Sequence, residues 1–292
     1  MNDRSEKKYI VCFFAPAMVI LIGFAGYITV ELFYLALTRW NIKSPTPTFI
    51  GIKNFIDIAV DVNFWRALSI TSIFTVCSVT LEIVLGFIVA FALFRKIAGL
   101  GIVRTLVIIP MAMTPVVVAM FWKIIYDPTL GPLNYFLSLV GITGPEWLSS
   151  TRIALFSLIL VNVWEWMPFS FLVITAGMSA LPKDVYDAAM IDGANFFQII
   201  YKITVPMLKQ VLLVLILLRT IDALKTFDLV FVMTHGGPGD VTQILPFYIY
   251  LKGFKWFDLG YASALSVVLL FFVMLIVRTY INNTGIKVFY ED

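Results

Sequence analysis

The chain has 292 residues, of which 61% are hydrophobic and only 13% are charged, and its formal net charge is +3. A soluble domain carries about 25% charged residues, so this chain has too little polar surface to cover its exterior in water. The composition excludes an ordinary soluble protein, and the small net charge does not indicate a nucleic-acid partner. We therefore expect an all-α integral membrane protein, in contact with lipid, that forms one membrane domain over residues 1–292.

Six apolar segments are long enough to cross about 30 Å of hydrocarbon as helices. They cover residues 9–37, 67–94, 102–125, 153–181, 206–233 and 258–280. The first contains 22 residues without a charge, Tyr9–Val30, which is longer than the apolar part of a signal peptide, so we expect a retained helix. Six spans place both termini on one side, and the slight excess of basic residues in the loops of that side predicts that it is cytoplasmic.

Several predicted spans carry ionisable residues, which are expensive at membrane depth and are therefore candidates for a functional site. Glu82 lies in the second span and Glu165 in the fourth. The fifth span carries a charged residue at every third position, namely Arg219, Asp222, Lys225 and Asp228. Opposite charges at this spacing can pair, so one interpretation is a self-neutralising ladder on the helix. The other is that this face lines a path for a polar solute, while Glu82 is more readily interpreted as a helix–helix contact.

The loop 182–205 carries the most specific motif of the chain. It reads Asp187-Ala188-Ala189, three residues, Gly193, nine residues, and then Ile203-Thr204-Val205-Pro206. This resembles the cytoplasmic signature of ABC importer permeases, in which Glu-Ala-Ala, three residues, Gly and nine residues precede Ile-x-Leu-Pro. Asp187 and Val205 replace Glu and Leu conservatively. The resemblance implies a type I ABC importer permease fold and a coupling contact with an ATPase subunit, made by Asp187, Ala188, Ala189, Gly193, Ile203 and Pro206.

The residues of this loop fit such a contact on physical grounds. Ala188 and Ala189 share one face of a short helix, where small side chains let a partner approach closely. Gly193 allows the chain to reverse, because glycine reaches backbone angles barred to other residues. We expect Phe196 and Phe197 to anchor in a groove of the partner. An ordinary amphipathic helix at the membrane surface is the alternative.

Shorter matches extend the resemblance along the chain to the maltose and glycerol-phosphate branch of the family. They are Phe49–Phe55, Gly131–Asn134 with Trp147-Leu148, Thr234–Pro238 and Leu259–Ala264. The resemblance implies a path for a sugar or sugar-like solute through the fourth and fifth spans, lined by Asn162, Trp166, Phe169, Asp222, Lys225 and Thr226. It also implies a second permease subunit, an ABC ATPase dimer, an extracytoplasmic solute-binding protein and a place in the bacterial inner membrane.

We expect a transporter subunit and not an enzyme. The sequence has no Gly-x-x-x-x-Gly-Lys-Ser/Thr phosphate loop, so we place ATP and Mg in the partner ATPase and expect no cofactor in this chain. His235 is the single histidine, which argues against a metal site. An ion-coupled secondary transporter is the alternative, although that class often shows internal repeats, and none is evident here. The sequence leaves open which solute is carried and whether its site lies on this subunit, its partner or both.

Overall fold

The structure is a computed structural model that describes residues 3–44, 46–94 and 100–284. Helices make up most of these residues, and their contacts divide the chain into two units. Unit 1 contains Met1–Phe64 and Tyr248–Phe272, and unit 2 contains Trp65–Phe247 and Val273–Asp292. The all-α fold is confirmed, whereas a single domain over residues 1–292 stays a prediction.

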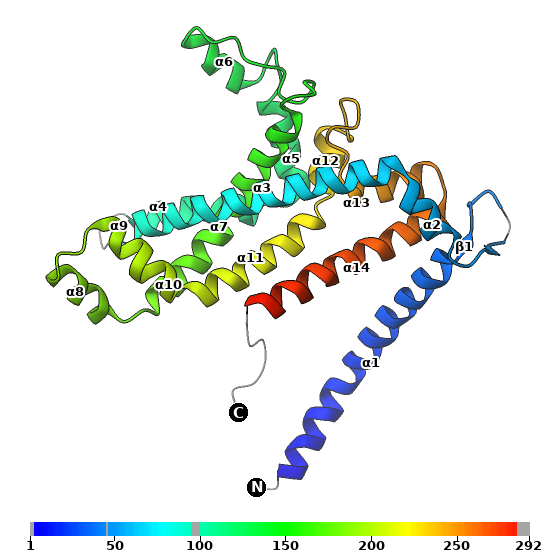
Figure 1. Ribbon diagram of the computed structural model, residues 1–292, viewed down its shortest axis with the longest axis horizontal. Helices are drawn as coiled ribbons and strands as arrows, with labels where there is room; N and C mark the ends of the chain where they lie inside the picture. Colours follow the sequence, from blue (N-terminus) through cyan, green and yellow to red (C-terminus); the bar gives the residue numbers. More distant parts are fainter. Residues whose placement is uncertain (1–2, 45, 95–99, 285–292) are drawn as a thin grey trace. The chain divides into compact units, whose positions relative to one another are not determined.

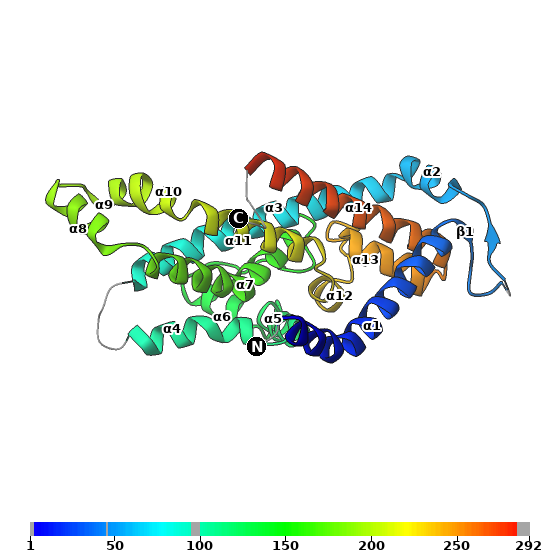
Figure 2. The ribbon, with the colours of Figure 1, turned by 90° about the horizontal axis from the view of Figure 1, so that it is seen from below.

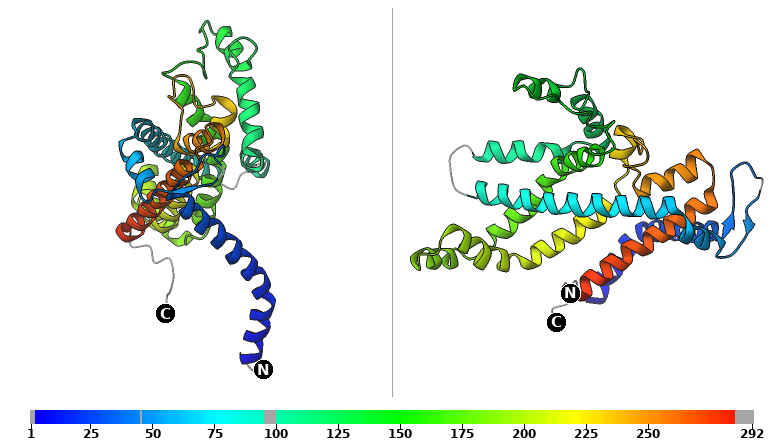
Figure 3. Two further views of the ribbon diagram at one scale, coloured as in Figure 1. Left: turned by 90° about the vertical axis from the view of Figure 1, so that its right-hand side faces the viewer. Right: turned by 45° about the horizontal axis from the view of Figure 1, so that its top comes forward.

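Unit 1 combines long apolar helices with a short hairpin. Its elements are α1 (Asp3–Ala36), β1 (Thr38–Arg39), β2 (Thr48–Phe49), α2 (Lys53–Val60), a π-helical turn η3 (Leu251–Lys255) and the first half of α14 (Leu259–Thr284). The two strands pair antiparallel, with Thr38 opposite Phe49. Figure 3 shows α1 as one continuous blue ribbon, which an apolar sequence with Pro16 as its only interior proline can form.

Strand β1 is held in place by Asn54, from the segment Phe49–Phe55, and by Gly260, from the segment Leu259–Ala264. The buried amide of Asn54 donates to the carbonyl oxygens of Ala36 and Thr38, both at 2.8 Å. Gly260 packs so closely that a Cβ there would lie 2.2 Å from the carbonyl oxygen of Thr38. A larger residue would displace the strand, because an approach of this closeness requires a residue without a side chain. These contacts give a structural reason for Asn54 and Gly260 in their motifs.

Asp61, which precedes α3, is the centre of a polar cluster in unit 1. Its carboxylate accepts hydrogen bonds from the hydroxyls of Tyr248 and Tyr261, each at 2.6 Å. Partial burial alone would raise the pKa of Asp61, but these bonds, a backbone bond from Asn63 and the charge of Lys252 hold it below its ordinary value. Asp61 is therefore a carboxylate whose ionised form is favoured by the folded state.

Unit 2 contains the remaining helices (Figure 1). They are α3 (Val62–Leu93), α4 (Leu100–Ile108), η1 (Ile109–Ala112), α5 (Pro115–Ile125), α6 (Pro132–Leu139), α7 (Ala154–Ser179), α8 (Lys183–Ile191), α9 (Phe196–Gln198), η2 (Ile199–Thr204), α10 (Val205–Met207), α11 (Lys209–Leu224), α12 (Asp228–Met233) and α13 (Leu245–Tyr250). The first residues of α3 and the last of α13 belong to unit 1. Helices α8 and α9 lie far from α12 along this unit (Figure 2).

Four helices of the described residues are long and apolar enough to cross a membrane, or six if each of two bent pairs is one span. The four straight ones are Phe13–Ala36, Val62–Leu93, Ala154–Ser179 and Leu259–Thr284. The predicted first, second, fourth and sixth spans therefore correspond to continuous helices. Their ends differ from the predicted limits by a few residues in either direction, because apolarity locates a span but does not fix the residue at which its helix begins or ends.

The predicted third span, residues 102–125, corresponds to a bent pair of helices and not to one straight helix. Gly101–Ala112 and Pro115–Ile125 meet at an angle of 101°. Pro110 begins a tight 3₁₀ turn, and Pro115 opens the next helix after an extended Thr114. The residue before a proline is driven out of the helical conformation, so Pro115 gives the break a physical cause.

The predicted fifth span, residues 206–233, also differs from the structure. The helical path begins earlier, at Phe196, and bends by 71° between Met207 and Lys209. It is interrupted again after Leu224, before α12 begins at Asp228. This second interruption falls within the run of charged residues, where backbone outside a helix can be tolerated because it lines a polar space instead of lipid.

Candidate functional site

A buried ion pair connects three helices of unit 2. Glu82 of α3 is fully buried and Arg219 of α11 is 1% exposed. The Arg219 Nε donates to Glu82 Oε2 at 2.7 Å, and a terminal nitrogen donates to Glu82 Oε1 at 3.3 Å. Asn162 of α7 donates from its amide to the same Oε1 at 2.7 Å. The interpretation of Glu82 as a helix–helix contact is confirmed. We call Glu82, Arg219 and Asn162 the buried clamp.

Further side chains surround the guanidinium of Arg219. The ring of Trp166 lies 4.5 Å from its central carbon, which is a cation–π geometry. Asp222 accepts from Arg219 at 3.4 Å and pairs with Lys225 at 3.3 Å. Both of the latter side chains are at least half exposed, so these outer pairs contribute little compared with the buried clamp. The predicted ladder of charges is thus formed as far as Lys225.

A cavity of about 250 Å³ lies beside the clamp. Its lining comes from the start of α5, the middle of α7, the end of α11, and the break between α11 and α12. The lining residues are Pro115, Asn162, Glu165, Trp166, Arg219, Asp222, Lys225, Thr226, Phe227, Asp228 and Leu229. Two helix interruptions, at Pro115 and at Lys225–Phe227, therefore meet at one polar space within the membrane-spanning part of the chain.

The predicted path residues are largely brought together by this cavity. Asn162, Trp166, Asp222, Lys225 and Thr226 all contribute to its lining. Phe169 does not; it packs against an apolar cluster that includes Phe171 and Leu215. The Asn162 amide donates one N–H to Glu82, which leaves its second N–H and its oxygen for another partner. A role for these residues in binding a solute stays a prediction.

Glu165 has a different environment from the other buried carboxylate. It is 3% exposed, lines the cavity, and its Oε1 has no hydrogen-bond partner within the described part of the chain. Glu82, by contrast, uses both oxygens in the clamp. A buried carboxylate oxygen without a partner is unfavourable unless water or a ligand supplies a donor. The sequence identified Glu165 as ionisable but gave no indication that one oxygen would face a cavity.

The loop with the specific motif forms two short helices joined at Gly193, as predicted. Helix α8 ends with hydrogen bonds from Gly193 N to Met190 O and from Ala194 N to Ala189 O. This is the Schellman arrangement, which needs a left-handed residue at the turn, and Gly193 has φ +76°. Asp187 and Ala188 are exposed and Ala189 is half-buried, so the face carrying these side chains is largely open.

The second half of the loop continues toward the membrane through an unusual helix. Asn195 and Gln198 form a reciprocal capping box at 2.9 and 2.8 Å, which starts α9. Ile199–Thr204 is then π-helical, and the hydroxyl of Thr204 lies 3.2 Å from that of Tyr186 in α8. This contact joins the two halves of the loop. Of the remaining motif residues, Ile203 is half-buried in the π-helix and Pro206 is exposed in α10.

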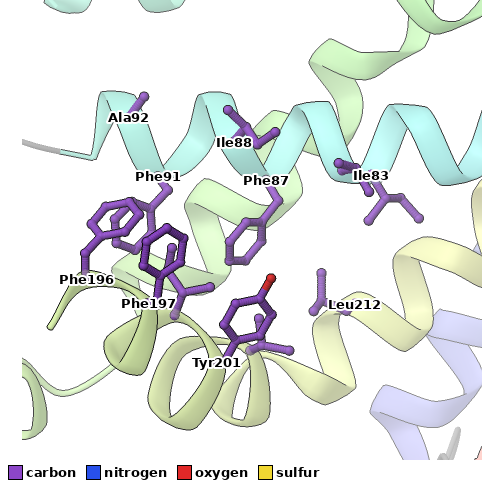
Figure 4. Close-up of a pocket in the computed structure, with 12 residues that line it drawn as sticks. Ile83, Phe87, Ile88, Phe91, Ala92, Phe196, Phe197, Tyr201 and Leu212 are labelled. Carbon is purple, nitrogen blue, oxygen red and sulfur yellow. The ribbon is translucent and has the colours of Figure 1, made fainter. Parts of the chain in front are cut away.

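Phe196 and Phe197 line an apolar groove of this chain. The ring of Phe196 packs edge-on against Phe91 of α3 with centroids 5.0 Å apart. Figure 4 shows Phe196, Phe197 and Tyr201 facing Phe87 and Phe91 across an apolar groove. The volume of this groove is about 800 Å³. Phe196 therefore has an aromatic neighbour within this chain, and the anchoring of Phe196 and Phe197 in a partner stays a prediction.

Comparison with known proteins is consistent with this arrangement. The family model described as "Binding-protein-dependent transport system inner membrane component" matches residues 82–284. The chain is 39% identical over 275 residues to the probable ABC transporter permease protein y4oQ of Sinorhizobium fredii, which covers 94% of this chain and 89% of that protein. It is 34% identical over 280 residues to the trehalose/maltose transport system permease protein MalF of Thermococcus litoralis, covering 95% and 94%.

A solved structure supports the fold. A chain of a bacterial ABC transporter involved in the import of the acidic polysaccharide alginate has a TM-score of 0.85 to this chain. The alignment covers 98% of each chain at 20% sequence identity. At that identity the similarity establishes the fold and does not establish a shared solute.

Proposed function

Because the chain belongs to the family of inner-membrane components of binding-protein-dependent transport systems, as a permease subunit of an ABC importer, we propose that its cavity is part of a sugar path. The solute is a sugar or sugar-like molecule delivered by an extracytoplasmic binding protein. The observation that carries the proposal is the cavity of about 250 Å³ at membrane depth. Its lining combines the aromatic ring of Trp166 with the polar groups of Asp222, Lys225 and Thr226.

The chemistry of this lining suits a sugar. Sugar hydroxyls need hydrogen-bond donors and acceptors, while the C–H faces of the ring pack well against an aromatic side chain. The relative from Thermococcus litoralis carries trehalose and maltose by its name, and the neighbour of known structure serves an acidic polysaccharide. The fold is therefore compatible with saccharides of different charge, and the side chains of the cavity must determine which are accepted.

We further propose a second, similar permease as the partner within the membrane. The 18-residue apolar window of α1 that lies within Phe13–Ala36 contains no buried residue in the described part of the chain. Lipid can cover such a helix, but a path for a polar solute must be closed to lipid on every side. The family's dependence on a separate binding protein supports the docking of that protein on the outer loops, which contain residues 39–61, 126–153 and 234–257.

The segment 182–206 is proposed to receive the movement of a separate ATPase dimer, which holds ATP and Mg. Helix α8 presents the small side chains of Ala188 and Ala189, and Gly193 fixes its direction with the Schellman turn. The contact of Tyr186 with Thr204 connects α8 to the helical path that continues into α11. The proposal puts this segment and both termini on the cytoplasmic side.

Uptake by the reconstituted importer tests the proposal. Proteoliposomes containing this chain, its partner permease, the ATPase and the binding protein should accumulate radiolabelled trehalose or maltose with internal ATP and without an ion gradient. Thr226→Val, which removes one cavity hydroxyl, should lower uptake at limiting solute by up to about tenfold. The matched control is Thr175→Val on α7, outside the cavity lining. Uptake driven by a proton or sodium gradient without the ATPase would refute the proposal.

A further inference from the structure

The carboxylates around the cavity are more numerous than the basic groups. Glu165, Asp222 and Asp228 line it, together with Arg219 and Lys225, and Glu82 neutralises Arg219 from the clamp. Four carboxylates thus face two cations within this group of described residues. Fields within a narrow, partly buried space are screened less than those at the surface, so a charge excess there acts on whatever enters.

The partners of these groups differ in a way that singles out Glu165. Arg219 donates to Glu82 and to Asp222 and packs against Trp166, and Lys225 is paired with Asp222. Neither cation donates a hydrogen bond to Glu165 within the described part of the chain, and the Oε1 of Glu165 has no partner there. The side chain is nevertheless only 3% exposed. Its free oxygen is therefore available to a donor inside the cavity and to little else.

We infer that Glu165 is a specificity-determining residue of the path, whose carboxylate accepts a hydroxyl or ammonium donor of the solute and excludes anionic solutes. The inference rests on the proposed function. A neutral polyol or an amino sugar satisfies the unpaired oxygen. A sugar phosphate or a uronate brings a further negative charge beside the carboxylates of Glu165, Asp222 and Asp228. An uncompensated like charge in a partly buried site is strongly disfavoured. The class of solute is thus neutral or cationic saccharides.

A water-filled cavity that only hydrates Glu165 is the competing explanation. A water molecule occupies about 30 Å³ in the liquid, so several would fit in a space of this size. Water would satisfy the free oxygen of an uncharged Glu165 equally well, and the cavity would then show no preference for the sign of an entering charge. The electrostatic potential inside the cavity separates the two explanations without any knowledge of the solute.

The potential can be measured with charged thiol reagents in the complete importer. The native cysteines are replaced as Cys12→Ala and Cys77→Ala, and Thr226→Cys places a thiol in the cavity lining. Two methanethiosulfonate reagents are compared, one with a cationic trimethylammonium-ethyl group and one with an anionic sulfonatoethyl group. The rate at which each reagent modifies the introduced thiol is divided by its rate of reaction with mercaptoethanol. Leu139→Cys on α6, where Leu139 is 64% exposed, is the reference site.

The cationic reagent should react faster at Cys in position 226, and Glu165→Gln should lower the cation-to-anion ratio by at least about fivefold at low salt. A unit charge about 8 Å away alters each reagent's local concentration by more than about twofold even in the dielectric of water, in opposite directions for the two reagents. Glu165→Asp, which keeps the carboxylate, should retain most of the ratio. Glu165→Gln should leave the ratio at the reference site unchanged.

Two results would overturn the inference in distinguishable ways. An unchanged ratio in Glu165→Gln, or a faster anionic reagent in the parent, would show that Glu165 does not set the potential, whether or not the cavity carries solute. The second readout is solute uptake after full modification of the thiol at position 226. This modification should block uptake. Undiminished uptake would remove the cavity from the path, and with it both the specificity role and the proposed site.

Discussion

The buried clamp makes a strong prediction about stability. Glu82→Gln preserves the size of the side chain but removes its charge and one acceptor, so one amide NH₂ group must face the donors of Arg219 or Asn162. The guanidinium is 1% exposed, so its charge loses the buried carboxylate to which it is hydrogen-bonded. Removal of one partner from a buried ion pair costs about 3–5 kcal/mol, so we expect a loss of that size in the free energy of unfolding.

The structure supplies a matched control on the same guanidinium. Asp222 also accepts from Arg219, at 3.4 Å, but its side chain is 50% exposed. Exposed ion pairs contribute about 0–1 kcal/mol, so Asp222→Asn should cost no more than about 1 kcal/mol. The double variant Glu82→Gln/Arg219→Gln replaces the ion pair by two amides that can bond to each other. It should be at least about 2 kcal/mol more stable than the sum of its single variants predicts.

The assay is unfolding of the purified chain in dodecyl maltoside by increasing mole fractions of SDS, followed by tryptophan fluorescence. The free energies of unfolding are obtained from the midpoints and slopes of these curves. The proteins compared are the wild type, Glu82→Gln, Arg219→Gln, their double variant and Asp222→Asn. A cost for Glu82→Gln no greater than that for Asp222→Asn would refute the reasoning, because burial would then not distinguish the two carboxylates. Additive single losses would show that the two side chains are not coupled.

Two further predictions concern other parts of the chain. Gly193→Val should reduce co-purification with a tagged ATPase severalfold. A Cβ at this position would meet nothing within 4 Å, but φ +76° strains a β-branched residue by about 1–3 kcal/mol. Asn tolerates this conformation, so Gly193→Asn should co-purify with more ATPase than Gly193→Val, and equal recovery of ATPase with the wild type and both variants would count against the role of the turn. The pKa of Asp61 is held below its ordinary value near 3.8, so its contribution to stability should be full above about pH 4 and should disappear as the pH falls through the folded-state pKa. Unfolding midpoints between pH 3 and 6 should therefore fall less steeply in Asp61→Asn than in the wild type, and parallel curves would contradict this assignment.

Much of the fold is contained in local sequence. Long apolar runs predict the straight helices because lipid requires both length and apolarity from a spanning segment. The Gly193 turn could be predicted because few residues accept its backbone angles. The 101° bend was also readable in principle, since Pro110 and Pro115 fall within the third apolar run. The absence of charge over Thr105–Trp122 indicates an apolar span but does not distinguish a straight helix from a bent one.

The arrangement of the site depended on contacts that no local pattern contains. Glu82 and Arg219 are 137 residues apart, and nothing in either helix specifies the other as its partner. Two opposite charges in separate apolar segments do predict that some pairing must occur, because unpaired charges are expensive there. The free oxygen of Glu165 and the position of Phe169 against the apolar cluster depend on how α7 is rotated, which follows from packing with its neighbours.

The π-helical turn Ile199–Thr204 bears on how this segment tolerates insertions and deletions. A π-helical turn holds about one residue more than an α-helical turn, and one residue of an α-helix corresponds to a rotation of about 100°. Deleting a single residue from this turn would restore an ordinary α-helical turn and leave the segments on either side in nearly the same rotational phase, whereas the same deletion in α11 would rotate one side against the other by about 100°. The π-helical turn is therefore the place in this segment where the chain best tolerates the loss of one residue.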